Sequence, residues 1–252
     1  LSLSSLYVAS ADYASARDCL KKGLETVVDA REKRSLTMAL ALSEVANGDR
    51  ATGIRLLSDL AAENEHEIRV RSLLLGIREI QEDKATAARL VDELRKAEGE
   101  SGLLWRLHQA SLWLSSADWK SRQQDIEDMM QYCITADPEW SSPPLILAEM
   151  YGRLDNPARV EDICRQALVR NPSATDVADK LLTLLEKQGR SSEVEKVLQQ
   201  VEATPQAASA WRVRSAVRTG DFSEAIEELK LRASNDERDA DSRVRLARLI
   251  YG

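Results

Sequence analysis

Short turn signals recur about every 35 residues along the chain. Each signal is centred on one residue, called the marker below, within a short stretch that contains residues favouring turns and helix caps. The seven markers are Asp12, Asp49, Asp83, Asp118, Asn156, Arg190 and Asp221. A period of this length is typical of proteins built from stacked supersecondary units, so we expect one repeated architecture.

The residues on both sides of each marker follow a helical pattern. The positions eight residues after the markers are all apolar, namely Leu20, Leu57, Val91, Ile126, Cys164, Leu198 and Leu229. The positions eight residues before the markers are mostly small or apolar, namely Ser4, Ala41, Leu75, Ala110, Ala148, Leu182 and Val213. Residues at such spacings share one face of a helix of period 3.6. The pattern therefore predicts an antiparallel helix pair in each repeat, with the marker in the turn.

Prolines and one irregular repeat refine this pattern. Pro138, Pro172 and Pro205 fall where second helices should end, because the residue before a proline resists the helical conformation. The fourth repeat departs from the pattern most. Gln109 and Arg122 occupy positions that are small or apolar elsewhere, and we expect about four extra residues in its second helix.

Composition supports an all-α fold. The chain has 252 residues, of which 43% are hydrophobic and only 4% aromatic, so Leu and Ala supply most of the packing. The net charge of -7 argues against nucleic-acid binding, and the longest apolar runs are far shorter than a membrane span. The three cysteines are too scattered for a disulfide framework or a paired metal motif.

The repeats resemble the tetratricopeptide repeat, a helix-turn-helix unit of 34 residues. The fifth repeat matches best, with small and large residues in the first helix at Leu147, Ala148 and Tyr151, and a closing proline at Pro172. The resemblance covers essentially residues 1–252, as about seven degenerate repeats plus a truncated eighth. It implies an α-solenoid, a right-handed superhelix of antiparallel helix pairs whose first helices line a concave groove. Such a groove generally holds a partner peptide or helix.

Two features suggest how the chain is divided and where it ends. The segment 105–144 is irregular and ends in a stiff proline-containing loop, so we expect a break in the stack or a sub-domain boundary there. Leu1 stands where an initiator Met would, and residues 243–252 resemble the first helix of a further repeat. We therefore expect the chain to be a fragment of a longer protein.

Tryptophans in the irregular segment form the first candidate binding site. Trp105 and Trp113, together with Trp119 and Trp140, could anchor a partner, because large aromatic side chains are enriched at binding hot spots. The alternative interpretation is that these side chains fill the space opened by the longer helix. A third interpretation is that they mark the sub-domain boundary.

Arginines near the C-terminus form the second candidate site. Arg214 and Arg218 lie on the first helix of the seventh repeat, and Arg243 and Arg248 on the next first helix. If first helices line the groove, these side chains form a basic stripe that would receive a partner's carboxylates. The alternative is that solvated arginines pair with the acidic second helix of the seventh repeat.

Motifs for catalysis are scarce. His66 and His108 are the only histidines, and neither belongs to a zinc-protease or nucleophile motif, so we expect both on the surface or on a helix face. No glycine-rich phosphate loop occurs. The carboxylate clusters 63–67 and 236–239 are more typical of helix caps than of metal sites. Cys133 and Cys164 are expected to pack in the core. We expect no cofactor, no metal and no enzymatic activity.

The sequence thus predicts an interaction scaffold that binds a protein or peptide segment, with an acidic segment favoured by the arginines. One alternative is the regulatory or substrate-recruiting arm of an enzyme whose catalytic domain lies outside residues 1–252. A helical RNA-processing scaffold is a further alternative, which the acidic net charge disfavours.

Overall fold

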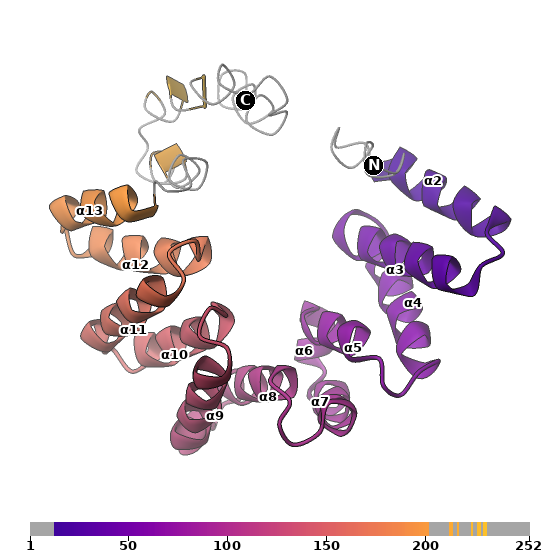
Figure 1. Cartoon of the computed structure of the whole chain (residues 1–252), viewed down its shortest axis with the longest axis horizontal. Coiled ribbons are helices and arrows are strands. Elements are labelled where there is room, and N and C mark those ends of the chain that lie inside the picture. Colours follow the sequence, from indigo (N-terminus) through magenta and orange to yellow (C-terminus); the bar gives the residue numbers. More distant parts are fainter. Residues whose placement is uncertain are drawn as a thin grey trace. The chain divides into compact units, whose positions relative to one another are not determined.

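A computed structural model describes residues 13–201 of the chain and, beyond them, residues 212, 213, 216, 223, 226, 227, 229 and 230. The described residues form helices and no strand, which confirms the predicted all-α class (Figure 1). The chain divides into two compact units, unit 1 at residues 1–117 and unit 2 at residues 118–252. The boundary lies within the segment 105–144, where the repeat is irregular.

Unit 1 is a series of helices in which neighbours along the chain pack against one another (Figure 1). Its described helices are α2 (Tyr13–Thr26), α3 (Ala30–Asn47), α4 (Arg50–Ala62), α5 (Ile68–Leu75), α6 (Arg78–Glu82), α7 (Lys84–Glu98) and α8 (Leu104–Leu114). The helix α5 also contacts both α7 and α8. The pairs α3 with α4 and α5 with α7 are therefore the first and second helices of successive repeats.

Unit 2 follows the same scheme. Its described elements are the 3₁₀ helix η1 (Trp119–Arg122), α9 (Gln123–Ala136), α10 (Ser142–Arg153), α11 (Pro157–Arg170), α12 (Thr175–Lys187) and α13 (Ser191–Val201). Each α-helix packs on the next, and α10 also contacts α12. Because α10 and α12 are the first helices of successive repeats, this contact places two first helices side by side.

The core confirms the predicted repeat register. All seven residues that stand eight positions after a marker are buried, from Leu57, Ile126 and Leu229 at 0% exposure to Leu20 at 5%. The residues eight positions before a marker are also buried wherever the structure describes them; Ser4 lies outside the described residues. Burial of these side chains against neighbouring helices supplies the main hydrophobic stabilisation of the stack.

Three of the markers act as helix caps. The side chains of Asp49, Asp83 and Asn156 accept hydrogen bonds from the backbone N–H groups three residues later, at the start of α4, α7 and α11. Such caps satisfy donors that the first helical turn leaves free. As the prolines predict, α9 ends before Pro138 and α11 ends before Pro172; Pro205 lies outside the described residues.

Two details differ from the sequence-based expectation. The extra residues of the fourth repeat do not lengthen its second α-helix; residues 119–122 form the separate 3₁₀ helix η1 before α9. The first helix of the third repeat is interrupted at Gly76 and Ile77, which separate α5 from α6. There the side chain of Gln81 donates a hydrogen bond of 2.9 Å to the Leu75 carbonyl, which replaces part of the lost helical bonding.

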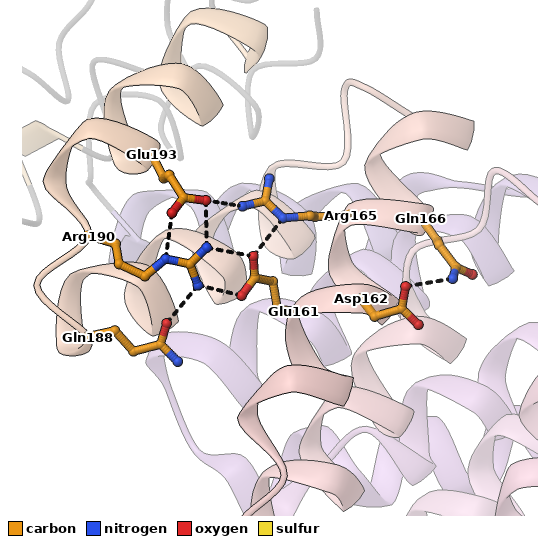
Figure 2. Close-up of polar contacts among 7 residues, drawn as sticks. All are labelled: Glu161, Asp162, Arg165, Gln166, Gln188, Arg190 and Glu193. Carbon is orange, nitrogen blue, oxygen red and sulfur yellow. Dashed lines mark hydrogen bonds and ion pairs between the residues drawn. The ribbon is translucent and has the colours of Figure 1, made fainter.

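A ring of charges joins α11 to the turn before α13 and to α13 itself (Figure 2). Arg190 donates hydrogen bonds of 2.6 Å to Glu161 and to Glu193. Arg165 donates bonds of 2.8 Å to the same two carboxylates. The hydrogen bonds from Arg190, followed by those from Arg165, lower the pKa of Glu161 below its ordinary value. The charges balance within the ring, so it links two second helices rather than offering a charged surface.

Candidate functional site

A pocket of about 290 Å³ opens in unit 2 between the turn that joins α10 to α11 and the facing side of α12. The lining residues come from the end of α10, the start of α11 and the C-terminal half of α12. They are Gly152, Asp155, Asn156, Pro157, Val160, Lys180, Thr183, Leu184 and Lys187. The pocket is therefore built from one helix pair and the first helix of the next repeat.

The turn at the edge of the pocket has an unusual backbone. Asp155 has φ 53°, in the left-handed region. The N–H of Asp155 donates to the Gly152 carbonyl at 3.1 Å, and the N–H of Asn156 donates to the Tyr151 carbonyl at 3.0 Å. This pair of hydrogen bonds ends α10 as a Schellman motif, and Asn156 then caps α11. The motif fixes the Asp155 backbone at the rim of the pocket.

Charges of both signs line the pocket. Lys180 donates a hydrogen bond of 3.2 Å to Glu149, which also accepts one of 3.0 Å from Arg153. The hydrogen bond from Arg153, followed by that from Lys180, lowers the pKa of Glu149. Among the described residues, neither the Asp155 carboxylate nor the Lys187 ammonium has a hydrogen bond or ion pair. The pocket thus holds one anionic and one cationic group that are open to a ligand.

The remaining lining is largely apolar. Val160 is 3% exposed and forms part of the core beneath the pocket, while Leu184 is half-buried and Pro157 is exposed. An apolar patch with a few polar groups at its edge is the usual composition of a binding pocket. The arrangement can bury an apolar side chain and pair with charged groups next to it.

Trp105 lies in the interior of unit 1. The residue is 5% exposed, and its Nε1 donates a hydrogen bond of 3.1 Å to the Gly99 carbonyl. The guanidinium carbons of Arg95 and Arg106 lie 4.8 and 4.4 Å from the ring centroid, within the range of cation–π attraction. This placement fits the space-filling interpretation of Trp105 better than an exposed anchor.

The other predicted site residues divide into two groups. Trp113, Trp119 and Trp140 are half-buried, so each keeps part of its surface accessible. The arginines of the predicted stripe lie outside the described part of the chain; they are Arg214, Arg218, Arg243 and Arg248. The stripe and the Trp113 anchor stay predictions.

His108 lies on a face of the helix α8, one of the two placements expected for it. It is half-buried on α8, and its Nε2 lies 2.7 Å from the Ser72 hydroxyl on α5. Burial lowers the pKa of His108 to about 4. The adjoining cavity of about 30 Å³ has room for roughly one water molecule. No carboxylate among the described residues hydrogen-bonds His108, so the third member of a catalytic triad is missing there. His66 is exposed, as predicted.

Other reactive groups are arranged for structure. Cys133 and Cys164 are buried at 0% and 1% exposure, and burial raises the pKa of the Cys164 thiol to about 11. Such a thiol is unreactive at neutral pH. Within the described ranges, no three His, Cys, Asp or Glu side chains lie close enough together to hold a metal ion. No described helix has both the length and the apolarity to cross a membrane.

Sequence reasoning did not identify the pocket. Asp155, Lys180 and Lys187 are surface residues outside the apolar register, so helical periodicity does not reveal them. The one sequence signal that points to the pocket is in the turn between α10 and α11. This turn, Leu154 to Pro157, has no glycine, whereas the turn between α12 and α13 has Gly189.

Comparison with known proteins identifies the fold. No protein-family model and no curated protein matches the sequence significantly. Among solved structures, the chain is similar to a tetratricopeptide repeat protein from Parabacteroides merdae ATCC 43184, with 13% identity and a TM-score of 0.53. That match covers 99% of this chain and 96% of the other.

Two further structures are similar. A thermophilic tetratricopeptide repeat protein of Thermus thermophilus shows 15% identity and a TM-score of 0.52, covering 86% of this chain and 98% of its own. PilF of Pseudomonas aeruginosa shows 13% identity and a TM-score of 0.50 with the same coverage. These similarities confirm that the chain has the tetratricopeptide-repeat fold.

Proposed function

We propose that this tetratricopeptide-repeat fold serves as a non-enzymatic scaffold whose unit 2 pocket binds a segment of a partner protein. The pocket itself is the observation that supports the proposal. It combines an apolar patch with two unpaired charges, Asp155 in the turn between α10 and α11 and Lys187 on α12. Side chains of an extended or helical protein segment offer this mixture of groups.

The size of the pocket and the surface beside it favour binding of a protein segment over binding of a small molecule. Burial of an apolar side chain against Leu184 and Pro157 contributes about 25 cal/mol per Å² of apolar surface. A pocket of about 290 Å³ is slightly smaller than the usual pocket for a drug-sized ligand. One or two side chains fill it, and contacts along α10 and α12 would supply the rest of the affinity. The first helices α10 and α12 pack together and so present a continuous surface for such contacts.

The predicted arginine stripe would extend this surface. Arg214 and Arg218 belong to the first helix that follows α13 in the repeat scheme, and Arg243 and Arg248 to the next one. If they face the same side as α12, they add positive charge for a segment with acidic residues. This part of the proposal rests on the sequence alone.

Binding by the full chain to a displayed library of random peptides tests the proposal. The matched variants are Lys187→Glu, in the pocket, and Lys196→Glu, on the exposed side of α13. Both replace an exposed lysine that has no partner among the described residues, so both make the same change in net charge. We expect selected peptides to bind the native chain and Lys196→Glu equally and Lys187→Glu more weakly. Equal binding by all three, or no selected peptide, contradicts the proposal.

A further inference from the structure

Asp155 has a backbone conformation that favours glycine. It is the one non-glycine residue with positive φ in the part of the chain that the structure describes. The equivalent position in the next repeat is Gly189, with φ 70° and the same pattern of turn hydrogen bonds: the N–H of Arg190 donates to the Leu185 carbonyl at 3.0 Å. The two equivalent turns therefore have the same left-handed backbone conformation at different residues, Asp155 and Gly189.

Local structure does not account for an aspartate at this position. An L-residue in the left-handed region costs free energy relative to glycine. Aspartate tolerates the region best when its side chain hydrogen-bonds nearby backbone groups. The Asp155 carboxylate makes no such bond within the described residues, and the capping of α11 is done by Asn156. A carboxylate is therefore held at a strained position without a structural partner.

Asp155 lines the unit 2 pocket together with Lys180 and Lys187 of α12. Lys180 is already paired with Glu149, whereas Lys187 has no partner among the described residues. The two open charges of the pocket are thus opposite in sign. A purely acidic segment would meet repulsion from Asp155, and a purely basic one would meet repulsion from Lys187.

We propose that Asp155 is a specificity-determining residue that pairs with a lysine or arginine of the bound segment. The preferred partner segment then has charges of both signs, a basic residue at Asp155 and an acidic residue at Lys187, beside an apolar residue. This inference rests on the proposed function of the pocket and narrows the acidic partner expected from the arginines. It also explains why the turn carries aspartate where its neighbour carries glycine.

Two substitutions separate the charge from the backbone. Asp155→Asn removes the charge and keeps a residue that tolerates the left-handed region, and Asp155→Gly supplies the residue found at the equivalent turn. Both variants should fold, and Asp155→Gly should unfold at the same temperature as the native chain or a higher one. A lower unfolding temperature of both variants would assign the carboxylate a structural role at the start of α11 and overturn the inference.

The experiment uses the full chain and peptides selected from the random library. We expect lysine or arginine to be enriched at one position of the peptides that depend on Lys187. Affinity for these peptides should fall about fivefold in Asp155→Asn and in Asp155→Gly. Replacing the enriched basic residue of the peptide by alanine should cost the native chain the same factor and the Asp155→Asn variant nothing further.

The outcomes distinguish the two proposals. Peptides that depend on Lys187 but show no basic enrichment and bind Asp155→Asn unchanged would overturn the role of Asp155 alone. Absence of any bound peptide would overturn the proposed function together with this inference.

Discussion

The backbone of Gly53 on α4 lies against the carbonyl oxygen of Ala41 on α3: a Cβ at Gly53 would be 2.7 Å from that oxygen. The same Cβ would lie 2.7 Å from a methyl group of Val45. Atoms do not approach this closely without displacement, so the two helices can pack at this distance only because position 53 has no side chain. Gly53 stands four residues after its marker, Asp49. Apart from Arg122, the residues at this position of the repeats are small or apolar, and small residues there allow neighbouring helices to pack closely.

Gly53→Ala should therefore destabilise the chain. Helix propensity alone predicts a gain of about 0.5–1 kcal/mol, but overpacking against Ala41 and Val45 costs about 1–3 kcal/mol. Gly152→Ala is the control, because a Cβ there meets no atom within 4 Å. Urea unfolding followed by circular dichroism should show Gly53→Ala less stable and Gly152→Ala equal or more stable than the native chain. A stabilised Gly53→Ala would contradict the packing.

A buried residue of the apolar register gives a second prediction. Leu57 is fully buried, and its replacement by alanine should lower the free energy of unfolding by about 2–5 kcal/mol, because it leaves a cavity between helices. Val28, at 96% exposure, is the control, and Val28→Ala should change stability by less than about 0.5 kcal/mol. Similar losses at the two positions would mean that the helices do not bury the register as described.

The charge ring predicts how one carboxylate titrates. The pKa of Glu161 lies below 4.5 because Arg190 and, to a smaller extent, Arg165 bond to it. NMR titration should show a rise in this pKa in Arg190→Gln and a smaller rise in Arg165→Gln. The ring stabilises the fold above the ordinary pKa of a glutamate, and this contribution is lost as the pH falls through the lowered value. Arg159→Gln, which removes a partner of Asp162 instead, should leave Glu161 unchanged.

The lowered pKa of His108 predicts that the fold loses stability in mild acid. Its pKa is about 4 in the fold and near 6.5 when unfolded, so between these values the unfolded chain binds a proton that the folded chain excludes. Stability should fall by about 1–3 kcal/mol as the pH drops from 6.5 to 4. His108→Gln should remove this part of the pH dependence, and His66→Gln, at an exposed site, should retain it. Identical pH profiles for both variants would contradict the burial of His108.

The repeats and their core residues could be predicted because the buried positions recur at a regular spacing along the sequence. Apolar residues such as Leu57 and Cys164 recur at one spacing, and Asp49 and Asn156 recur as caps, so a simple periodicity locates helices and turns. The break between α5 and α6 was not predicted, because a single glycine such as Gly76 is also tolerated within a helix and the apolar residues continue beyond it at Ile77 and Ile80. The burial of His108 likewise depends on Ser72, which lies 36 residues away along the chain.

The candidate site was harder to predict than the fold. Surface residues are free of the packing constraint, so Asp155 and Lys187 carry no periodic signal. The sequence suggests Trp105 as a binding anchor because its side chain is large and aromatic. Its contacts with Arg95, Arg106 and the Gly99 carbonyl depend on how the loop between α7 and α8 folds. Residue type alone does not distinguish a binding anchor from a core residue.

The most direct test of the account is to map where a selected peptide binds. Amide chemical shifts of the isotope-labelled full chain should be recorded as the peptide is added. We predict that the largest changes fall on the pocket, at Gly152, Asp155, Thr183 and Leu184, with little change at Tyr132 on α9 or Val169 on α11. Changes centred on those second helices, with the pocket amides unmoved, would contradict the assignment of the unit 2 pocket as the binding site.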